Sequence, residues 1–143
     1  MKLYVLDLGK IIMRGENPVI SADHDGGEEP AIPIHAFLLD TPAGKILFDT
    51  GCHPQAMEGA WPAQMCTNPY VPGEGGKLLE RLEQIGVKPE DISIVVASHL
   101  HLDHAGGIYL FPKAKVYVQQ QELDRVLHDA ATGTLEVFCV PCD

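Results

Sequence analysis

The sequence predicts a single α/β domain, because strand and helix patterns alternate along its 143 residues. Residues 34–39 and 45–48 are apolar runs joined by the turn-forming residues 40–44, which predicts a β-hairpin. Residues 76–85 carry leucines at helical spacing and predict an amphipathic helix closed by Gly86. The continuous apolar run at 92–97 predicts a strand buried on both faces.

The remaining elements are shorter or less regular. Residues 2–7 and 9–13 flank Gly9 and predict a strand pair, followed by a solvated, acidic loop over 14–33. Residues 51–76 are rich in proline and glycine and predict a long loop with one short helix. Residues 114–118 predict a further strand, and residues 119–128 a helix.

Composition limits the classes of partner. Ten Lys and Arg against twenty Asp and Glu give a formal net charge of −10, which disfavours nucleic acids and anionic membrane surfaces. We recognise neither a signal peptide nor a membrane helix, and four cysteines are too few for a disulfide scaffold, so we expect a cytoplasmic protein. Cys139 and Cys142 form a C-x-x-C unit, which provides half of a tetrahedral zinc site or a redox pair.

Three imidazoles and one carboxylate follow the apolar run at 92–97. His99 and His101 are two positions apart and project to the same side if strand geometry persists, so both can bind one metal ion. Asp103 and His104 offer an oxygen and a nitrogen to that ion or to a second one. Ligand sites in α/β sheets gather at the carboxyl ends of strands, so the pattern predicts a metal site there.

Asp49 follows the second hairpin strand in the same manner. Metal-bound histidines usually donate their free N–H to a carboxylate, and Asp49 is the best candidate for that acceptor. A simple turn formed by Asp49, Thr50 and Gly51 is the alternative. The isolated histidines are interpreted as surface or packing residues: His24, His35, His53 and His128.

These residues carry a family resemblance. The run from His99 to His104 resembles the HxHxDH motif of the metallo-β-lactamase superfamily, and Phe48-Asp49-Thr50-Gly51 resembles its upstream Asp-Thr-Gly. Ser98 before the motif and Ala105-Gly106-Gly107 after it make the chain most similar to N-acyl homoserine lactonases. The resemblance covers about residues 2–128.

The resemblance implies an αββα sandwich that holds two zinc ions, with His99 and His101 on the first and Asp103 and His104 on the second. It implies that metal-bound hydroxide opens the lactone ring, which would make the chain a quorum-quenching hydrolase. By the same analogy, Asp103 helps to protonate the leaving alkoxide and Leu102 contacts the substrate. The alternatives are another ester, lactone or thioester hydrolase of the superfamily, or a non-catalytic metal-binding or interaction module.

The chain departs from the family after residue 128. The third histidine of the first zinc, the bridging aspartate and the last histidine of the second zinc are not found. We therefore expect residues 1–143 to be a truncated domain, about the N-terminal half of the sandwich, with residues 129–143 as a divergent tail. A homodimer that rebuilds the sandwich and a tail that supplies replacement ligands are the alternatives, and an uncovered apolar sheet face is expected.

Overall fold

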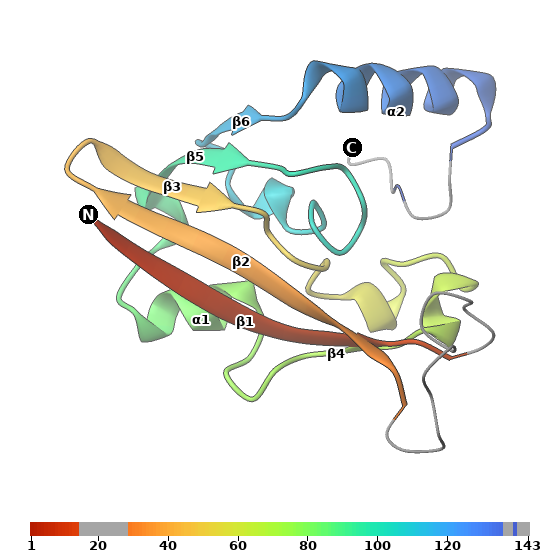
Figure 1. The fold of residues 1–143 in the computed structure, drawn as a ribbon, viewed down its shortest axis with the longest axis horizontal. Coiled ribbons are helices and arrows are strands. Elements are labelled where there is room, and N and C mark those ends of the chain that lie inside the picture. The colour runs from red at the N-terminus through yellow and green to blue at the C-terminus, as the bar shows by residue number, and fades with distance from the viewer. Residues whose placement is uncertain (15–28, 136–138, 140–143) are drawn as a thin grey trace.

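The computed structural model describes residues 1–14, 29–135 and 139. Within them, one mixed sheet has the strand order β4-β1-β2-β3-β5-β6 (Figure 1). The strands are β1 Lys2–Ile12, β2 Ala31–Thr41, β3 Gly44–Phe48, β4 Tyr70–Val71, β5 Ile92–Val96 and β6 Lys115–Tyr117. The helices are η2 Ala56–Glu58, η3 Met65–Thr67, α1 Leu78–Gln84, η4 Pro89–Asp91, η5 Ile108–Leu110 and α2 Gln120–Thr132.

The direction of the strands places the functional residues. β1, β2 and β3 pair antiparallel, whereas β3, β5 and β6 run parallel to one another. The carboxyl ends of β3 and β5 therefore meet at one edge of the sheet, and the segments that begin at Asp49 and Ala97 leave from that edge.

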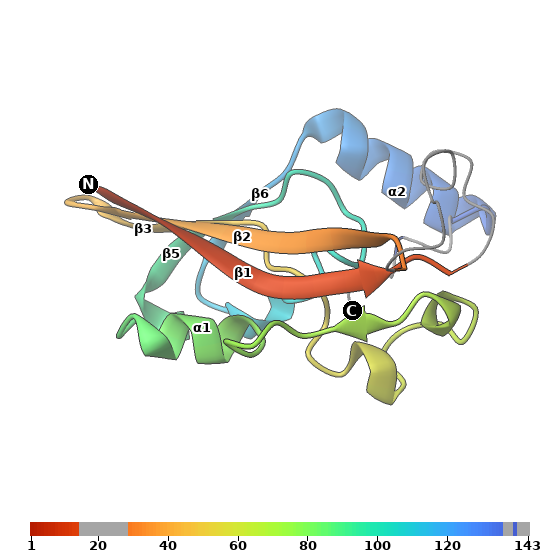
Figure 2. The same cartoon turned by 60° about the horizontal axis from the view of Figure 1, so that its bottom comes forward.

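One face of the sheet forms the hydrophobic core. Ile34, Ala36 and Leu38 alternate with less buried residues along β2, so their side chains share that face. Helix α1 packs its buried side chains Leu78 and Leu82 into the same core. Figure 2 shows α1 and the segment of η2 on this side of the sheet, with α2 on the other side.

The alanine variant of Leu82 tests this packing. The Leu82 side chain is fully buried, so Leu82→Ala is expected to lower the free energy of unfolding by about 3 kcal/mol, through lost burial and the cavity left behind. Leu79 lies on the same helix with 37% of its surface exposed, and Leu79→Ala serves as the matched control with an expected loss below about 1 kcal/mol. The free energy of unfolding is measured by urea denaturation. Equal losses in Leu82→Ala and Leu79→Ala would contradict the assignment of Leu82 to the core.

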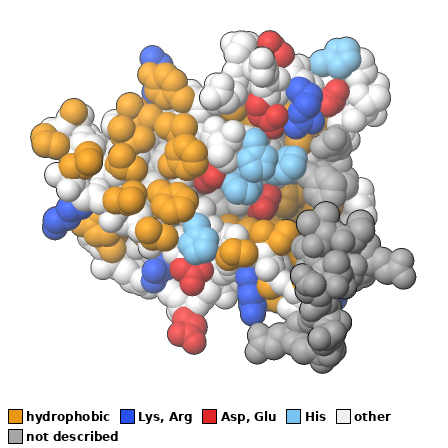
Figure 3. Space-filling model, in the orientation of Figure 1, with side chains coloured by type: hydrophobic (Ala, Val, Ile, Leu, Met, Phe, Trp, Pro, Cys, Tyr) orange, Lys and Arg blue, Asp and Glu red, His pale blue; other side chains and the backbone are white. Residues whose placement is uncertain are grey.

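The opposite face of the sheet, called the open face below, is apolar and partly exposed. Directly opposed residues on five neighbouring strands form a continuous row across it: Val5, Phe37, Phe48, Val96 and Tyr117. Val5 is 56% exposed and Tyr117 46% exposed. Hydrophobic side chains gather over this part of the molecule in Figure 3.

The open face corrects the expectation for residues 92–97. Ile92 and Val95 are buried, but Ile94 and Val96 are only half-buried, so β5 is covered on one face and not on both. In the part of the chain that the structure describes, no second sheet covers the side chains of Ile94 and Val96.

The expected strand pair at residues 2–13 is also wrong. β1 is one continuous strand with an irregularity between Asp7 and Gly9. Gly9 has a φ of 108° and donates its N–H to the Asp7 carboxylate, so the chain bulges without reversing. β2 begins at Ala31, inside the expected loop, whereas residues 15–28 lie outside the described residues.

The other sequence predictions hold with shifted ends. The hairpin of β2 and β3, the helix α1 and the strand β6 are confirmed. The long loop contains two short helices, η2 and η3, and the edge strand β4. Helix α2 extends past residue 128 to Thr132, where Gly133 ends it with a φ of 72°. Among the described residues, no helix has the length and apolar character needed to cross a membrane.

Candidate metal site

The candidate site lies where β3 and β5 end. Asp49 directly follows β3 and donates its backbone N–H to the Val96 carbonyl, which extends the pairing of the two strands. Ser98 follows β5 after one residue, Ala97, which donates its backbone N–H to Tyr117 on β6. Both polar residues are therefore held by strand ends, as the sequence predicts.

The Asp-Thr-Gly turn holds the loop that carries the histidines. Thr50 donates both its backbone N–H and its hydroxyl to the His104 carbonyl, at 2.7 and 3.0 Å. The Gly107 N–H in turn donates to the Thr50 hydroxyl oxygen, and Gly51 forms a bridge with Ala105. Residues 49–51 are thus more than a simple turn, because they fix residues 104–107 from 54 or more positions away.

Gly106 is required by the close approach of two backbone segments. A Cβ atom at this position would lie 2.4 Å from the His53 backbone nitrogen and 2.5 Å from the Leu102 carbonyl oxygen. A side chain cannot fit there without moving one of these segments. Glycine at this position therefore lets two backbone segments pass close to each other next to the histidines.

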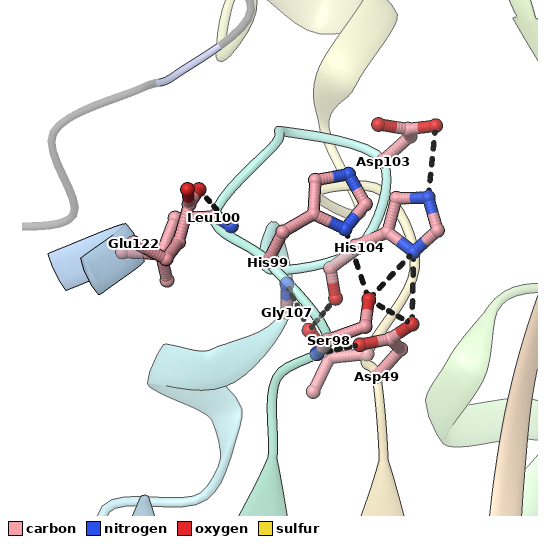
Figure 4. Close-up of polar contacts among 9 residues, drawn as sticks. Asp49, Ser98, His99, Leu100, Asp103, His104, Gly107 and Glu122 are labelled. Atoms are coloured by element: carbon pink, nitrogen blue, oxygen red, sulfur yellow. Dashed lines mark hydrogen bonds and ion pairs between the residues drawn. The ribbon is translucent and has the colours of Figure 1, made fainter. Parts of the chain in front are cut away.

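The Asp49 carboxylate collects three hydrogen bonds. Its Oδ1 accepts the Ser98 backbone N–H at 2.7 Å, and its Oδ2 lies 2.8 Å from both the Ser98 hydroxyl and His104 Nδ1 (Figure 4). Asp49 is 5% exposed, and burial, the largest influence on its pKa, acts to raise it. The hydrogen bonds from His104 and Ser98 outweigh burial and hold the pKa of Asp49 below its ordinary value.

The three imidazoles lie against one another. The ring centroids of His99 and His104 are 4.1 Å apart, and those of His99 and His101 are 4.5 Å apart. Burial, followed by repulsion from His104 and His101, lowers the pKa of His99. The hydrogen bond with Asp49 raises the pKa of His104. His99 therefore favours the neutral form, which is the form that binds metals.

Asp103 lies on the far side of His104 from Asp49. Its Oδ2 is 3.5 Å from His104 Nε2, so the two nitrogens of His104 face two different carboxylates (Figure 4). Leu102, between His101 and Asp103, is 4% exposed and belongs to the hydrophobic core. A contact between Leu102 and substrate therefore stays a prediction.

Glu122 supports the histidine loop and was not anticipated from the sequence. Its carboxylate on α2 accepts the Leu100 N–H at 2.9 Å and pairs with Arg125. It thereby ties the backbone between His99 and His101 to the helix. Glu122 lies 22 residues beyond Leu100, and only its place in the first turn of a predicted helix could have suggested a structural role.

The donor types suit a zinc ion, while the side chains are not arranged as a closed site. His99 and His104 both turn Nδ1 toward Ser98 and Asp49 and Nε2 toward the side of Asp103 (Figure 4). Across residues 1–14, 29–135 and 139, no group of three or more His, Cys, Asp or Glu side chains is positioned to hold a metal. The described residues thus offer donor types that zinc binds, with His99 Nε2, His104 Nε2 and the Asp103 carboxylate on one side of the cluster.

The remaining candidates lie elsewhere or outside the described residues. Cys139 is buried and its sulfur accepts a long hydrogen bond from Arg125, while Cys142 and His24 lie outside the described residues. His35 stacks on Phe37, and His53 stacks on Tyr109 with ring centroids 4.9 Å apart. His35 and His53 therefore act as packing residues, as expected.

The sheet thus carries a cluster of histidines and carboxylates at its carboxyl edge, where ligand sites of α/β sheets gather. The sequence profile of the metallo-beta-lactamase superfamily matches residues 30–120, so the chain belongs to that superfamily. The match covers β2 to the start of α2 and includes Asp49 and the whole histidine motif.

Several known proteins are similar to the chain over about half of their own length. The N-acyl homoserine lactonase AiiB of Agrobacterium fabrum is 39% identical in an alignment 142 positions long, which covers 92% of this chain and 51% of that protein. The N-acyl homoserine lactonase of Bacillus thuringiensis is 30% identical over 89% of this chain and 52% of that protein. The chain therefore spans about half the length of the curated relatives that it matches.

Two solved structures also match this chain over about half of their own length. A variant of B. thuringiensis AiiA with N-decanoyl-L-homoserine at its active site matches with a TM-score of 0.68 and 28% identity, over 88% of this chain and 51% of that one. An N-acyl homoserine lactone hydrolase with N-hexanoyl-L-homoserine at its catalytic metal centre matches equally well, with a TM-score of 0.68 and 29% identity over the same shares. The chain thus adopts about half of the metallo-β-lactamase fold.

Proposed function

We propose that the chain carries part of the catalytic site of a zinc-dependent hydrolase that opens the lactone ring of N-acyl homoserine lactones. The proposal rests chiefly on the buried Asp49 carboxylate, which orients His104 beside His99 and Asp103. The names of the relatives and the lactonase products bound in two similar structures support this substrate class.

We assign the metal ligands as the family resemblance implies. His99 and His101 would hold a first zinc ion, and Asp103 and His104 a second one. A zinc ion bound there would lower the pKa of its water molecule to about 7 and would polarise an ester carbonyl. Three ligands plus water are usual for a catalytic zinc, so these four donors need further ligands from outside the described residues.

Asp103 is the residue of this chain that we propose for proton transfer. Lactone hydrolysis adds water to the carbonyl carbon and breaks the ring C–O bond, and the leaving alkoxide then needs one proton. The attacking water loses one proton as its oxygen bonds to the carbonyl carbon. The Asp103 carboxylate, on the far side of His104 from Asp49, would accept that proton and pass it to the alkoxide as the ring C–O bond breaks. Asp49 keeps His104 in place during this step, because its carboxylate is buried and already holds three donors.

We also propose that a second apolar layer covers the open face. Large exposed apolar surfaces usually mark interaction sites, and the row from Val5 to Tyr117 crosses five strands. A homodimer that pairs two open faces is the cover that we propose, and residues 129–143 remain proposed as a divergent tail.

Lactone hydrolysis tests the proposed function directly. The purified chain is loaded with zinc, mixed with N-hexanoyl-L-homoserine lactone, and the acid released is titrated at constant pH against a buffer blank. We expect ring opening above the blank, its loss with a chelator and its return with zinc. A zinc-loaded chain that matches the blank would refute catalysis and favour the metal-binding module. Faster turnover of a simple ester or thioester would favour the related hydrolases.

A further inference from the structure

The hydroxyl group of Ser98 connects His99 to the Asp49 carboxylate. Its oxygen lies 2.8 Å from Asp49 Oδ2 and 3.0 Å from His99 Nδ1 (Figure 4). The same Asp49 oxygen lies 2.8 Å from His104 Nδ1. Ser98 is thus placed between Asp49 and His99, whereas His104 reaches Asp49 directly.

The positions of the protons follow from which of these groups can donate a hydrogen bond and which can only accept one. An ionised carboxylate only accepts hydrogen bonds, and both oxygens of Asp49 face donors: the Ser98 backbone N–H at Oδ1, and the Ser98 hydroxyl and His104 Nδ1 at Oδ2. The single Ser98 proton must therefore point at Asp49, because two facing oxygen lone pairs would repel at 2.8 Å. The Ser98 oxygen is then left as an acceptor, and His99 Nδ1 must carry the proton between them.

The proton of His104 can be placed by the same assignment of donors and acceptors. Its Nδ1 faces Asp49 Oδ2, which can only accept, so Nδ1 carries a proton there too. In the neutral form of His99, Nε2 is then left with a free lone pair, whereas His104 Nε2 faces Asp103 Oδ2 at 3.5 Å. Both Nε2 atoms lie on the side of Asp103 (Figure 4).

We propose that Ser98 is a positioning residue that extends the control of Asp49 from one imidazole to two. Its hydroxyl, held by Asp49, sets the tautomer of His99 with Nδ1 protonated and Nε2 available as a ligand. Its backbone N–H donates to Asp49 Oδ1 at 2.7 Å and thereby holds the Ser98 hydroxyl next to the carboxylate. The role of Nε2 as a zinc ligand rests on the proposed function, but the tautomer of His99 does not.

Three variants separate this role from a structural one. Ser98→Ala removes the hydroxyl, and Ser98→Thr restores it. Ser93→Ala is the matched control, because Ser93 lies on β5 and its hydroxyl donates only to the Lys45 carbonyl at the other end of the strand. Thermal unfolding of each variant establishes that it is folded.

The first readout is the tautomer of His99 in the metal-free chain. Long-range ¹H–¹⁵N correlation spectra at a pH where the imidazole is neutral distinguish protonated Nδ1 from protonated Nε2, and a His99→Gln variant assigns the signals. We expect protonated Nδ1 in the unmodified chain, in Ser98→Thr and in Ser93→Ala, and a mixture of tautomers in Ser98→Ala. Protonated Nε2 in the unmodified chain, or no change in Ser98→Ala, would overturn the proposal.

The second readout is zinc affinity, measured by competition with a chromophoric chelator. We expect Ser98→Ala to weaken binding by about tenfold, as losses of groups that orient metal-bound histidines typically do, with recovery in Ser98→Thr. Full affinity in Ser98→Ala would overturn the positioning role. A chain that binds no zinc but shows the expected tautomers would refute the proposed function and leave the assignment of Ser98 intact.

Discussion

Replacement of His101 or Asp103 by alanine is expected to abolish lactone hydrolysis. Each variant removes a donor from a cluster in which the described residues provide only two ligands for each ion, so the remaining donors would hold zinc weakly. Without the metal, the site would have neither a water molecule with a lowered pKa nor a group that polarises the carbonyl at neutral pH. Turnover of N-hexanoyl-L-homoserine lactone, with zinc content measured in the same sample, checks this.

His35→Ala is the control for these variants. His35 lies on β2, where its ring stacks on Phe37, and it has no place in the proposed site. We expect its turnover and zinc content to match those of the unmodified chain. Unchanged turnover in His101→Ala or Asp103→Ala would remove the histidine motif from the mechanism.

Replacement of Asp49 by asparagine is expected to lower zinc affinity by about 10- to 100-fold. The amide group of asparagine has one oxygen, so it cannot accept the three hydrogen bonds that Asp49 receives from His104 and Ser98. The NH₂ group of the new asparagine is itself a donor, so it would face a donor of Ser98 or His104 without forming a hydrogen bond. An imidazole of the cluster would then lose the contact that orients it. Calorimetric titration with zinc measures the effect.

The control for Asp49 is Asp40→Asn on the same hairpin. Asp40 pairs with Lys45 at 2.9 Å near the surface, where ion pairs contribute little to stability. We expect full zinc affinity in this variant. Equal affinities in Asp49→Asn and Asp40→Asn would show that Asp49 acts as a turn residue only.

The candidate site could be predicted from the sequence because its donors are local. Four potential ligands lie within six positions, between His99 and His104, directly after an apolar strand. Asp49 could be paired with them because the carboxyl ends of parallel strands share an edge, and the structure places its Oδ2 at 2.8 Å from His104 Nδ1.

The features that could not be predicted depend on tertiary contacts. Glu122 reaches the Leu100 N–H across 22 residues, and no local pattern encodes that contact. The open face was expected from the missing half of the sandwich, but an apolar run such as Ile92 to Val96 looks the same whether one or both of its faces are covered. The bulge at Gly9 was interpreted as a reversal because glycine permits both.

The central claim is that this chain binds metal through the HxHxDH segment. A native mass spectrum of the chain with added zinc tests it most directly, because it reports bound zinc and the number of copies together. We expect zinc-bound chains, with two copies in each assembly, and loss of zinc in Asp103→Ala. An unmodified chain that stays free of zinc while a known zinc protein in the same buffer is loaded would contradict the claim.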